Sequence, residues 1–270
     1  MRRALYVFLG LMATAYGFEE KPWLGNLWEF YLDTGYMFSR YDSVANSTKH
    51  LKAPSNNNVF SVDIGLVPID SWDAAIEVDF AQTPRQSLGR RSVAAQVRTL
   101  WLNDIIGDFV SLTTGFSVRQ TSYRSLHDIS CPYSARWDFE INSAMGKEWG
   151  CGPNWCMRLY GLGAVGQGSR GSPWTRAKVA YQIHQLESHI WEFFSLGYWG
   201  FGRRREVNIN HFNGWGFYDH SSIDLGFGYL YELGVWGRLR FDYSHCIHAR
   251  VYPRGTNSFI IGYHLPFSLF

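Results

Sequence analysis

Apolar residues recur at every second position in a series of short segments that begins at residue 28 and runs to the end of the chain. Between residues 28 and 39 the even positions are nearly all apolar, whereas the odd positions include Glu29, Asp33 and Ser39. Comparable segments lie at 28–38, 60–66, 72–80, 93–101, 110–118, 137–145, 155–159, 175–183, 190–201, 223–231, 239–243 and 259–267. A period of two is typical of a β-strand whose two faces meet different surroundings. We therefore predict twelve strands; segment 190–201 is apolar on both faces, so its phase stays open.

The connections between these segments alternate between short and long. Short connections are expected at 68–71, 103–108, 146–153, 187–189 and 232–234, and longer polar ones at 42–57, 82–91, 121–135, 166–173, 202–220 and 249–257. Transmembrane barrels have an even number of antiparallel strands of about ten residues, with short periplasmic turns and longer external loops. We predict an all-β fold: a closed antiparallel transmembrane β-barrel of about 12 strands, with both termini on the periplasmic side.

Aromatic residues make up 17% of the chain, and most of the twelve tryptophans lie near predicted strand ends. One group flanks the short connections: Trp72, Trp101, Trp149, Trp155, Trp191 and Trp236, with Trp28 opening the first strand. A second group lies towards the opposite strand ends: Trp137, Trp174 and Trp199. Two aromatic girdles, one at each membrane interface, are typical of such barrels. A soluble β-sandwich also alternates, but it needs a polar solvent face, and here one face carries almost no charge.

The first residues predict export. Arg2 and Arg3 precede an apolar run from Ala4 to Ala15, and residues 15–17 (Ala-Tyr-Gly) fit a small-x-small cleavage pattern. Twelve apolar residues are too few to span a bilayer as a helix. We predict a cleaved signal peptide at 1–17 and a barrel over 18–270 that resides in the bacterial outer membrane.

Over that whole length the chain resembles bacterial outer-membrane β-barrel proteins. Its terminal aromatic residue, Phe270, looks like the signal read by the barrel-assembly machinery, which would be one partner, with outer-membrane lipid as another. Three short motifs also resemble uncharacterised exported proteins of chlamydia-like bacteria: SLHDIS at 125–130, GSPW at 171–174 and WGFG at 199–202. The resemblance implies a location and a fold, and no particular activity.

Charged residues on the non-lipid positions are the candidate functional residues. They are Asp73, Glu77, Asp79, Arg98, Arg119, Asp138, Glu140, Arg158, Arg176, Lys178, Arg238, Arg240 and Asp242. If neighbouring charges pair, as Glu77 with Arg98 or Asp138 with Arg119 could, they plug the lumen. If acidic and basic walls stay apart, they create a field across a water-filled pore. Uncompensated charge in a dry lumen is very costly, so either pairing or water is required.

These residues lead to two functional hypotheses. The first is a porin-like barrel for passive passage of small polar solutes. The alternative is a plugged barrel whose long external loops, 121–135 and 202–220, act in binding or adhesion. With 18% charged residues, a net charge of +2 and no basic run longer than residues 203–205, the sequence does not favour nucleic-acid binding.

An outer-leaflet lipid hydrolase is a third hypothesis. Its candidate residues are the runs Asp219-His220-Ser221-Ser222 and Tyr243-Ser244-His245. Triads are defined by geometry and not by order in the chain, so the sequence leaves this open. Cys151 and Cys156 flank one predicted turn, where a hairpin disulfide could form in an exported protein. No Walker loop, Rossmann glycine pattern or HExxH motif is present, and we expect no cofactor and no metal site.

Overall fold

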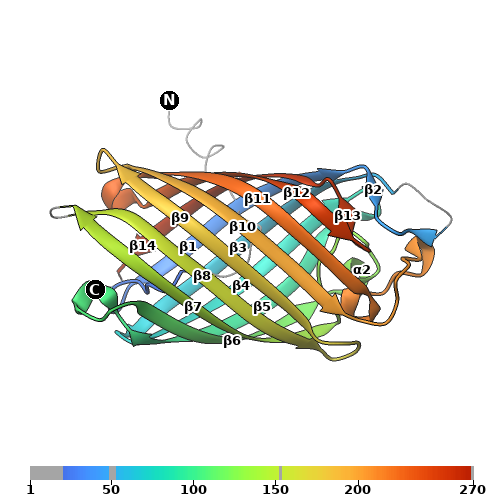
Figure 1. Ribbon diagram of the computed structural model, residues 1–270, viewed down its shortest axis with the longest axis horizontal. Helices are drawn as coiled ribbons and strands as arrows, with labels where there is room; N and C mark the ends of the chain where they lie inside the picture. Colours follow the sequence, from blue (N-terminus) through green and yellow to red (C-terminus); the bar gives the residue numbers. More distant parts are fainter. Residues whose placement is uncertain (1–20, 49–52, 152–153, 269–270) are drawn as a thin grey trace.

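The computed structural model describes residues 21–48, 53–151 and 154–268, and in this part of the chain twelve strands close into one antiparallel barrel (Figure 1). The barrel strands are β1 (Phe30–Tyr41), β3 (Ser55–Ile69), β4 (Trp72–Thr83), β5 (Gln86–Leu102), β6 (Ser111–Thr121), β7 (Trp137–Cys151), β8 (Asn154–Gly168), β9 (Trp174–Gln185), β10 (His189–Phe201), β11 (Asp219–Glu232), β12 (Arg238–Arg250) and β14 (Asn257–Phe267). The predicted fold class is confirmed. The predicted signal peptide and Phe270 lie outside the described residues.

The barrel closes where its first strand pairs with its last. β1 pairs with β14 from Phe30↔Phe267 to Arg40↔Asn257, and its other edge pairs with β3. The start of β1 and the end of β14 therefore lie at one end, together with the short connections; we call this the turn end and the opposite one the loop end. The turn end carries the 3-10 turns η2 (Asp104–Ile106) and η5 (Gly234–Trp236). Among the described residues no helix has the length and apolarity needed to cross a membrane.

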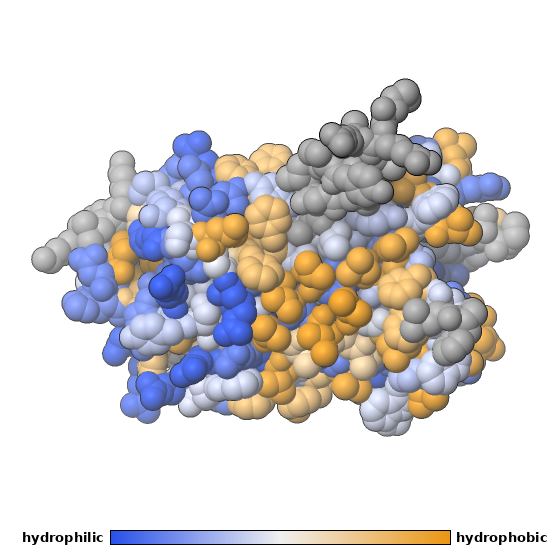
Figure 2. All heavy atoms as spheres, turned by 180° about the vertical axis from the view of Figure 1, so that it is seen from behind, coloured by the Kyte–Doolittle hydropathy of each residue, from blue (hydrophilic) through white to orange (hydrophobic). Residues whose placement is uncertain are grey.

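The outer face of the barrel is apolar. Large side chains that the alternation places outward are 37% to 67% exposed, including Val62, Ile64, Ile76, Phe116, Ile141, Val179, Phe193, Phe241 and Phe259. Figure 2 shows apolar residues gathered over the middle of the barrel and towards the turn end, with hydrophilic residues concentrated at the loop end. Such a surface is stable against lipid and not against water, and closure removes the unpaired strand edges that lipid could not satisfy.

Two predicted connections are wrong in their bounds. Residues 82–91 form a tight hairpin instead of a long loop, because the Thr83 hydroxyl accepts hydrogen bonds from the backbone N–H groups of Arg85 (3.0 Å) and Gln86 (3.1 Å). At the turn end, β7 continues to Cys151, through most of the predicted connection 146–153. In both cases the strand pairs continue beyond their apolar stretch, because a backbone ladder does not require apolar side chains.

The loops at the loop end pack into a small core of their own. Its buried members, which we call the cap, are Tyr41, Val44, Ala53, Ile129, Val207, Phe212, Trp215, Tyr218 and Val251. The cap joins the connections after β1, β6, β10 and β12, which contain β2 (Ser43–Val44), α2 (Tyr123–Leu126), η3 (Ile209–His211), η4 (Trp215–Phe217) and β13 (Pro253–Arg254). β2 pairs with β13, and Figure 1 shows these segments gathered at one end of the barrel.

Candidate functional site: the lumen

Most charged residues inside the barrel form ion pairs between nearby strands. Near the turn end, Arg98 of β5 holds Asp73 of β4 through two hydrogen bonds of 3.0 and 2.5 Å. Farther along, Arg119 of β6 contacts Glu77 at 2.6 Å and Asp79 at 3.2 Å, both on β4. The two pairings suggested by the sequence, Glu77 with Arg98 and Asp138 with Arg119, are therefore not the ones that form. The Arg119 side chain reaches past β5 to β4, and the order of residues in the chain does not predict a contact across two strands.

The opposite wall holds a second group of charges around Glu192, a residue that the alternation in the sequence did not single out. Glu192 is fully buried and lies 2.9 Å from Arg240 and 3.7 Å from Lys178, and Arg240 also contacts Asp242 at 2.6 Å. The Tyr160 hydroxyl donates a hydrogen bond of 3.1 Å to the Glu192 carboxylate. Glu192 lies in the segment 190–201 that is apolar on both faces; the structure places Ile190, Glu192 and Phe194 inward.

The remaining predicted charges lie towards the two ends. Arg176 of β9 holds Glu140 of β7 with hydrogen bonds of 2.8 and 2.9 Å. Asp138 accepts hydrogen bonds from two backbone N–H groups of the loop after β6, those of Ser134 and Ala135, each at 3.2 Å. At the turn end Arg158 pairs with Glu148 at 2.5 Å, and Arg238, at the start of β12, lies opposite His264 of β14.

The ion pairs between strand residues run along the wall and not across the lumen, whereas Lys21, in the segment before β1, acts electrostatically on Glu192 from inside the barrel. Each of these ion pairs links residues on the same strand or on strands one or two places apart in the barrel order. Large inward aromatic side chains also lie against the wall. The Tyr31 ring occupies the space that a Cβ on Gly65 would fill, and the Phe194 ring occupies the space that a Cβ on Gly226 would fill. Glycine lets the neighbouring side chain approach the backbone closely, which keeps these rings out of the barrel axis.

A chamber of about 290 Å³ lies inside the barrel, towards the loop end. Its wall includes charged residues (Arg91, Arg119, Asp138, Glu140, Arg176 and Asp224), aromatic residues (Tyr41, Tyr133, Trp174, Tyr198 and Tyr252) and several serines. Trp174 was expected in an aromatic girdle, but it is 8% exposed and faces the chamber. A tryptophan at a strand end fits either location, so alternation alone did not decide its side.

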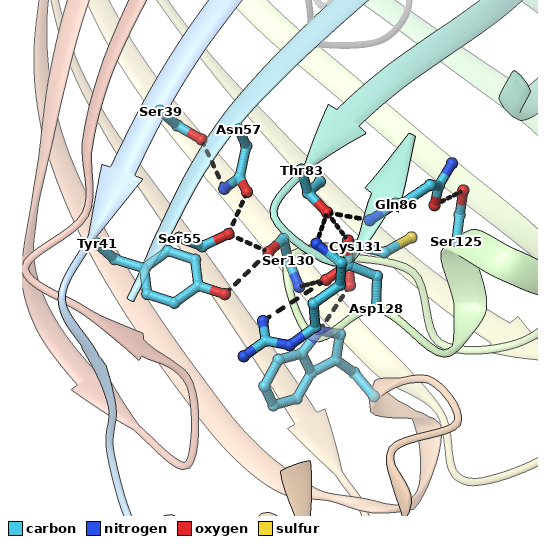
Figure 3. A network of polar contacts seen from close by, with 12 residues as sticks. Ser39, Tyr41, Ser55, Asn57, Thr83, Gln86, Ser125, Asp128, Ser130 and Cys131 are labelled. Atoms are coloured by element: carbon cyan, nitrogen blue, oxygen red, sulfur yellow. Dashed lines mark hydrogen bonds and ion pairs between the residues drawn. The ribbon is translucent and has the colours of Figure 1, made fainter. Parts of the chain in front are cut away.

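The loop after β6 folds inward over one side of this chamber. Figure 3 shows its network: the Ser130 hydroxyl contacts Tyr41 of β1 at 2.9 Å and Ser55 of β3 at 3.0 Å. Asp128 accepts a hydrogen bond of 2.5 Å from Thr83, and the Trp215 indole donates one of 2.8 Å to the Cys131 carbonyl. The loop is thus tied both to the barrel wall and to the cap.

At the turn end, the segment before β1 lies inside the barrel. The Lys21 carbonyl accepts a hydrogen bond of 2.9 Å from Arg98, and the Trp23 indole donates one of 2.9 Å to Asp104 of η2. The Trp23 ring is 8% exposed and packs edge-on against Tyr160, with ring centroids 5.9 Å apart. This obstruction was not predicted, because a segment without alternation carries no signal for where it lies.

Asp104 holds that segment through the hydrogen bond that it accepts from Trp23. Partial burial raises the pKa of Asp104, but hydrogen bonds from Ser111 and from the backbone N–H of Glu148, together with the one from Trp23, lower the pKa by more. The net result is a pKa below the ordinary value of an aspartate. The carboxylate form is therefore the form that holds Trp23 in place.

The candidate hydrolase residues are not arranged as a catalytic unit. Ser244 is 3% exposed and faces the lumen, whereas the next residue, His245, is on the other face of β12 and contacts the Asn257 amide oxygen at 3.0 Å. His220 is buried among the rings of Tyr198, Trp215 and Tyr252. Its two nitrogens have no hydrogen-bond partner among the described residues.

Two of the four cysteines are joined. Cys151 and Cys156 form a disulfide at the turn between β7 and β8, with a Cα–Cα distance of 5.5 Å. Cys131 and Cys246 are buried free thiols near the loop end. The bridge closes a hairpin that the strand pairing already joins, so it adds local stability at the turn end.

Comparison with known proteins supports the fold. No protein-family model and no curated protein sequence matches the chain. Among solved structures, an outer-membrane channel from Pseudomonas putida F1 has a TM-score of 0.67 at 10% identity, covering 93% of this chain and 100% of its own. The NanC porin gives 0.56 at 10% identity (87% and 98% covered). The translocator domain of the autotransporter NalP from Neisseria meningitidis gives 0.51 at 12% identity (98% and 94% covered).

Closed topology, apolar exterior and charged interior define the class. The chain has the fold of bacterial outer-membrane β-barrel proteins, with twelve strands in its described residues. Proteins of similar fold include channels and porins as well as a translocator domain, so the fold alone does not select an activity.

Proposed function

We propose that the protein is an outer-membrane channel for passive passage of small polar solutes. The observation that carries the proposal is the direction of the ion pairs: they run along the wall between nearby strands. Charges paired in this way line a lumen without bridging its diameter. The thirteen predicted lumen residues then act as a polar lining that water can wet, which offsets the cost of placing them inside the barrel.

The two ends of the lumen limit the size of the solute. The cap and the loop after β6 cover the chamber at the loop end, and Trp23 occupies the turn end. A chamber of about 290 Å³ accommodates a small molecule and not a folded domain. We therefore expect low conductance and a sharp size limit.

A binding role for the loop end is the second candidate. The observation that favours it is the cap, since loops that share nine buried residues present a pre-ordered surface. Pre-order lowers the entropy cost of association. In this alternative the lumen stays closed and the cap contacts an envelope or host partner.

Single-channel recording of the refolded protein in planar bilayers separates the two candidates. Steady conductance, together with swelling of proteoliposomes in small sugars or amino acids, is the expected result. A Glu77→Gln variant, which removes one half of an ion pair with Arg119, should change ion selectivity if the current runs through this lumen. A folded, heat-modifiable wild type that carries no current would overturn the channel proposal.

A further inference from the structure

Two charged side chains that face the chamber lack an ion-pair partner among the described residues. Arg91 of β5 is 5% exposed and forms no ion pair with a described residue. Its guanidinium lies over the Tyr133 ring, 5.2 Å from the centroid, and bonds to the Cys131 side chain, while Asp79 acts on it only from beyond ion-pair distance. Asp224 of β11 also lines the chamber and forms no ion pair. The other arginines of the chamber are both compensated, Arg119 by Glu77 and Asp79 and Arg176 by Glu140.

Both side chains lie beside register shifts of the barrel sheet. In the pairing of β4 with β5, Asp79 is opposite Ser92 and Phe80 is opposite Arg90, so Arg91 is the extra residue. In the pairing of β11 with β12, Ile223 is opposite His248 and Asp224 is opposite Cys246, so the extra residue is Ile247 of β12. A bulge redirects a side chain at some cost in pairing, and bulges recur beside functional sites. The first of these two places Arg91 inside the barrel while its neighbour Arg90 stays exposed.

The two groups line the same chamber. Burial raises the pKa of the Tyr252 hydroxyl, Asp224 adds to the rise, and Arg91 opposes it, so this hydroxyl lies within electrostatic reach of both charges. Tyr252, Tyr198 and Trp174 supply aromatic surface to the same chamber. The chamber thus has a positive pole, a negative pole and an apolar wall.

We propose that the chamber binds a small zwitterion, an amino acid or a short peptide, with its carboxylate on Arg91 and its ammonium group on Asp224. A guanidinium pairs with a carboxylate in a bidentate geometry, and a buried ion pair stabilises binding only when both partners are present. A zwitterion compensates both poles at once, whereas a singly charged solute leaves one of them unpaired. This inference rests on the proposed channel function, because it names the solute class that the channel would carry.

Isothermal titration of the detergent-folded protein tests the inference without any measurement of current. The probes are glycine, diglycine and triglycine, with N-acetylglycine as the anion-only analogue and glycinamide as the cation-only analogue. At least one zwitterion should bind about tenfold or more tightly than either blocked analogue, because each analogue lacks one of the two charged groups that the chamber would bind. The length that binds best then reports the spacing of the two poles.

Variants assign the two poles. Arg91→Gln should weaken zwitterion binding by about tenfold or more, so that the zwitterion binds no better than glycinamide. Asp224→Asn should lower the affinity for the zwitterion until it binds no better than N-acetylglycine. Arg90→Gln and Asp70→Asn, which alter exposed residues, are the matched controls and should leave binding unchanged.

Two results would overturn the inference: no zwitterion binds the folded wild type, or N-acetylglycine binds as tightly as glycine and its peptides. The wild-type probe series decides the matter even if a variant fails to fold. A wild type that conducts steadily but binds no zwitterion refutes only this inference. A folded wild type that binds a zwitterion but carries no current refutes only the channel proposal.

Discussion

Glu192 offers the sharpest test of how the lumen is held together. Replacing it by glutamine keeps the shape of the side chain and the contacts to Tyr160 and Gln182, but removes the negative charge that lies within ion-pair distance of both Lys178 and Arg240. Arg240 keeps Asp242 at 2.6 Å. The variant isolates an electrostatic effect, because no cavity is created.

The expected loss in free energy of unfolding follows from how deeply Glu192 and its partners are buried. Removing one partner of a fully buried ion pair costs about 3–5 kcal/mol, because the other charge is left uncompensated. The Glu192 side chain is fully buried, but Lys178 is 11% and Arg240 25% exposed, so water in the lumen recovers part of the loss. We therefore expect Glu192→Gln to lower the free energy of unfolding by about 3 kcal/mol, at the lower end of that range.

Equilibrium unfolding in guanidinium, followed by tryptophan fluorescence in lipid bilayers, measures this loss. Glu187→Gln, on the exposed turn before β10, is the control and should lie within about 0.5 kcal/mol of wild type. The double variant Glu192→Gln/Lys178→Met should recover part of the stability, because it also removes the ammonium that Glu192 pairs with. A loss below about 1 kcal/mol for Glu192→Gln would refute the reasoning and mean that the lumen is fully hydrated at this site.

The remaining predictions concern the lipid face, the turn end and ion selectivity. Ile76→Arg, on the 59% exposed outer face, should destabilise the barrel by about 2–4 kcal/mol in bilayer folding assays; an unchanged stability would contradict the assigned register. Trp23→Ala should raise conductance by removing the obstruction at the turn end. Because the pKa of Asp104 is lowered, its hold on Trp23 is present above pH 3.8, its reference value, and is lost as the pH falls through its folded value; wild-type conductance should rise only under such acidification. Neutralising Arg176 and Lys178 should shift the reversal potential towards cations, and the shift should shrink at 1 M salt, where the screening length is about 3 Å.

The sequence alone determined the class of fold. Alternation with a period of two assigned the lipid-facing positions, such as Ile76 and Ile141, because lipid accepts only apolar side chains and every second residue must therefore be apolar. The same constraint placed the charged residues inside. Because the two faces of each strand meet different surroundings, the sequence alternates with a period of two. This alternation does not depend on which side chains pair inside the barrel.

Tertiary structure decided how the residues inside the barrel are arranged and paired. The pairing of Arg119 with Glu77 and Asp79 depends on strand register and on a reach of two strands, which no local pattern encodes. The phase of Glu192 was hidden because inward aromatic residues, tolerated beside glycine on the next strand, made both faces of β10 apolar. Arg91 and Trp23 were missed for a related reason: a β-bulge shifts the alternation by one residue, and a segment before the first strand has no alternation to read.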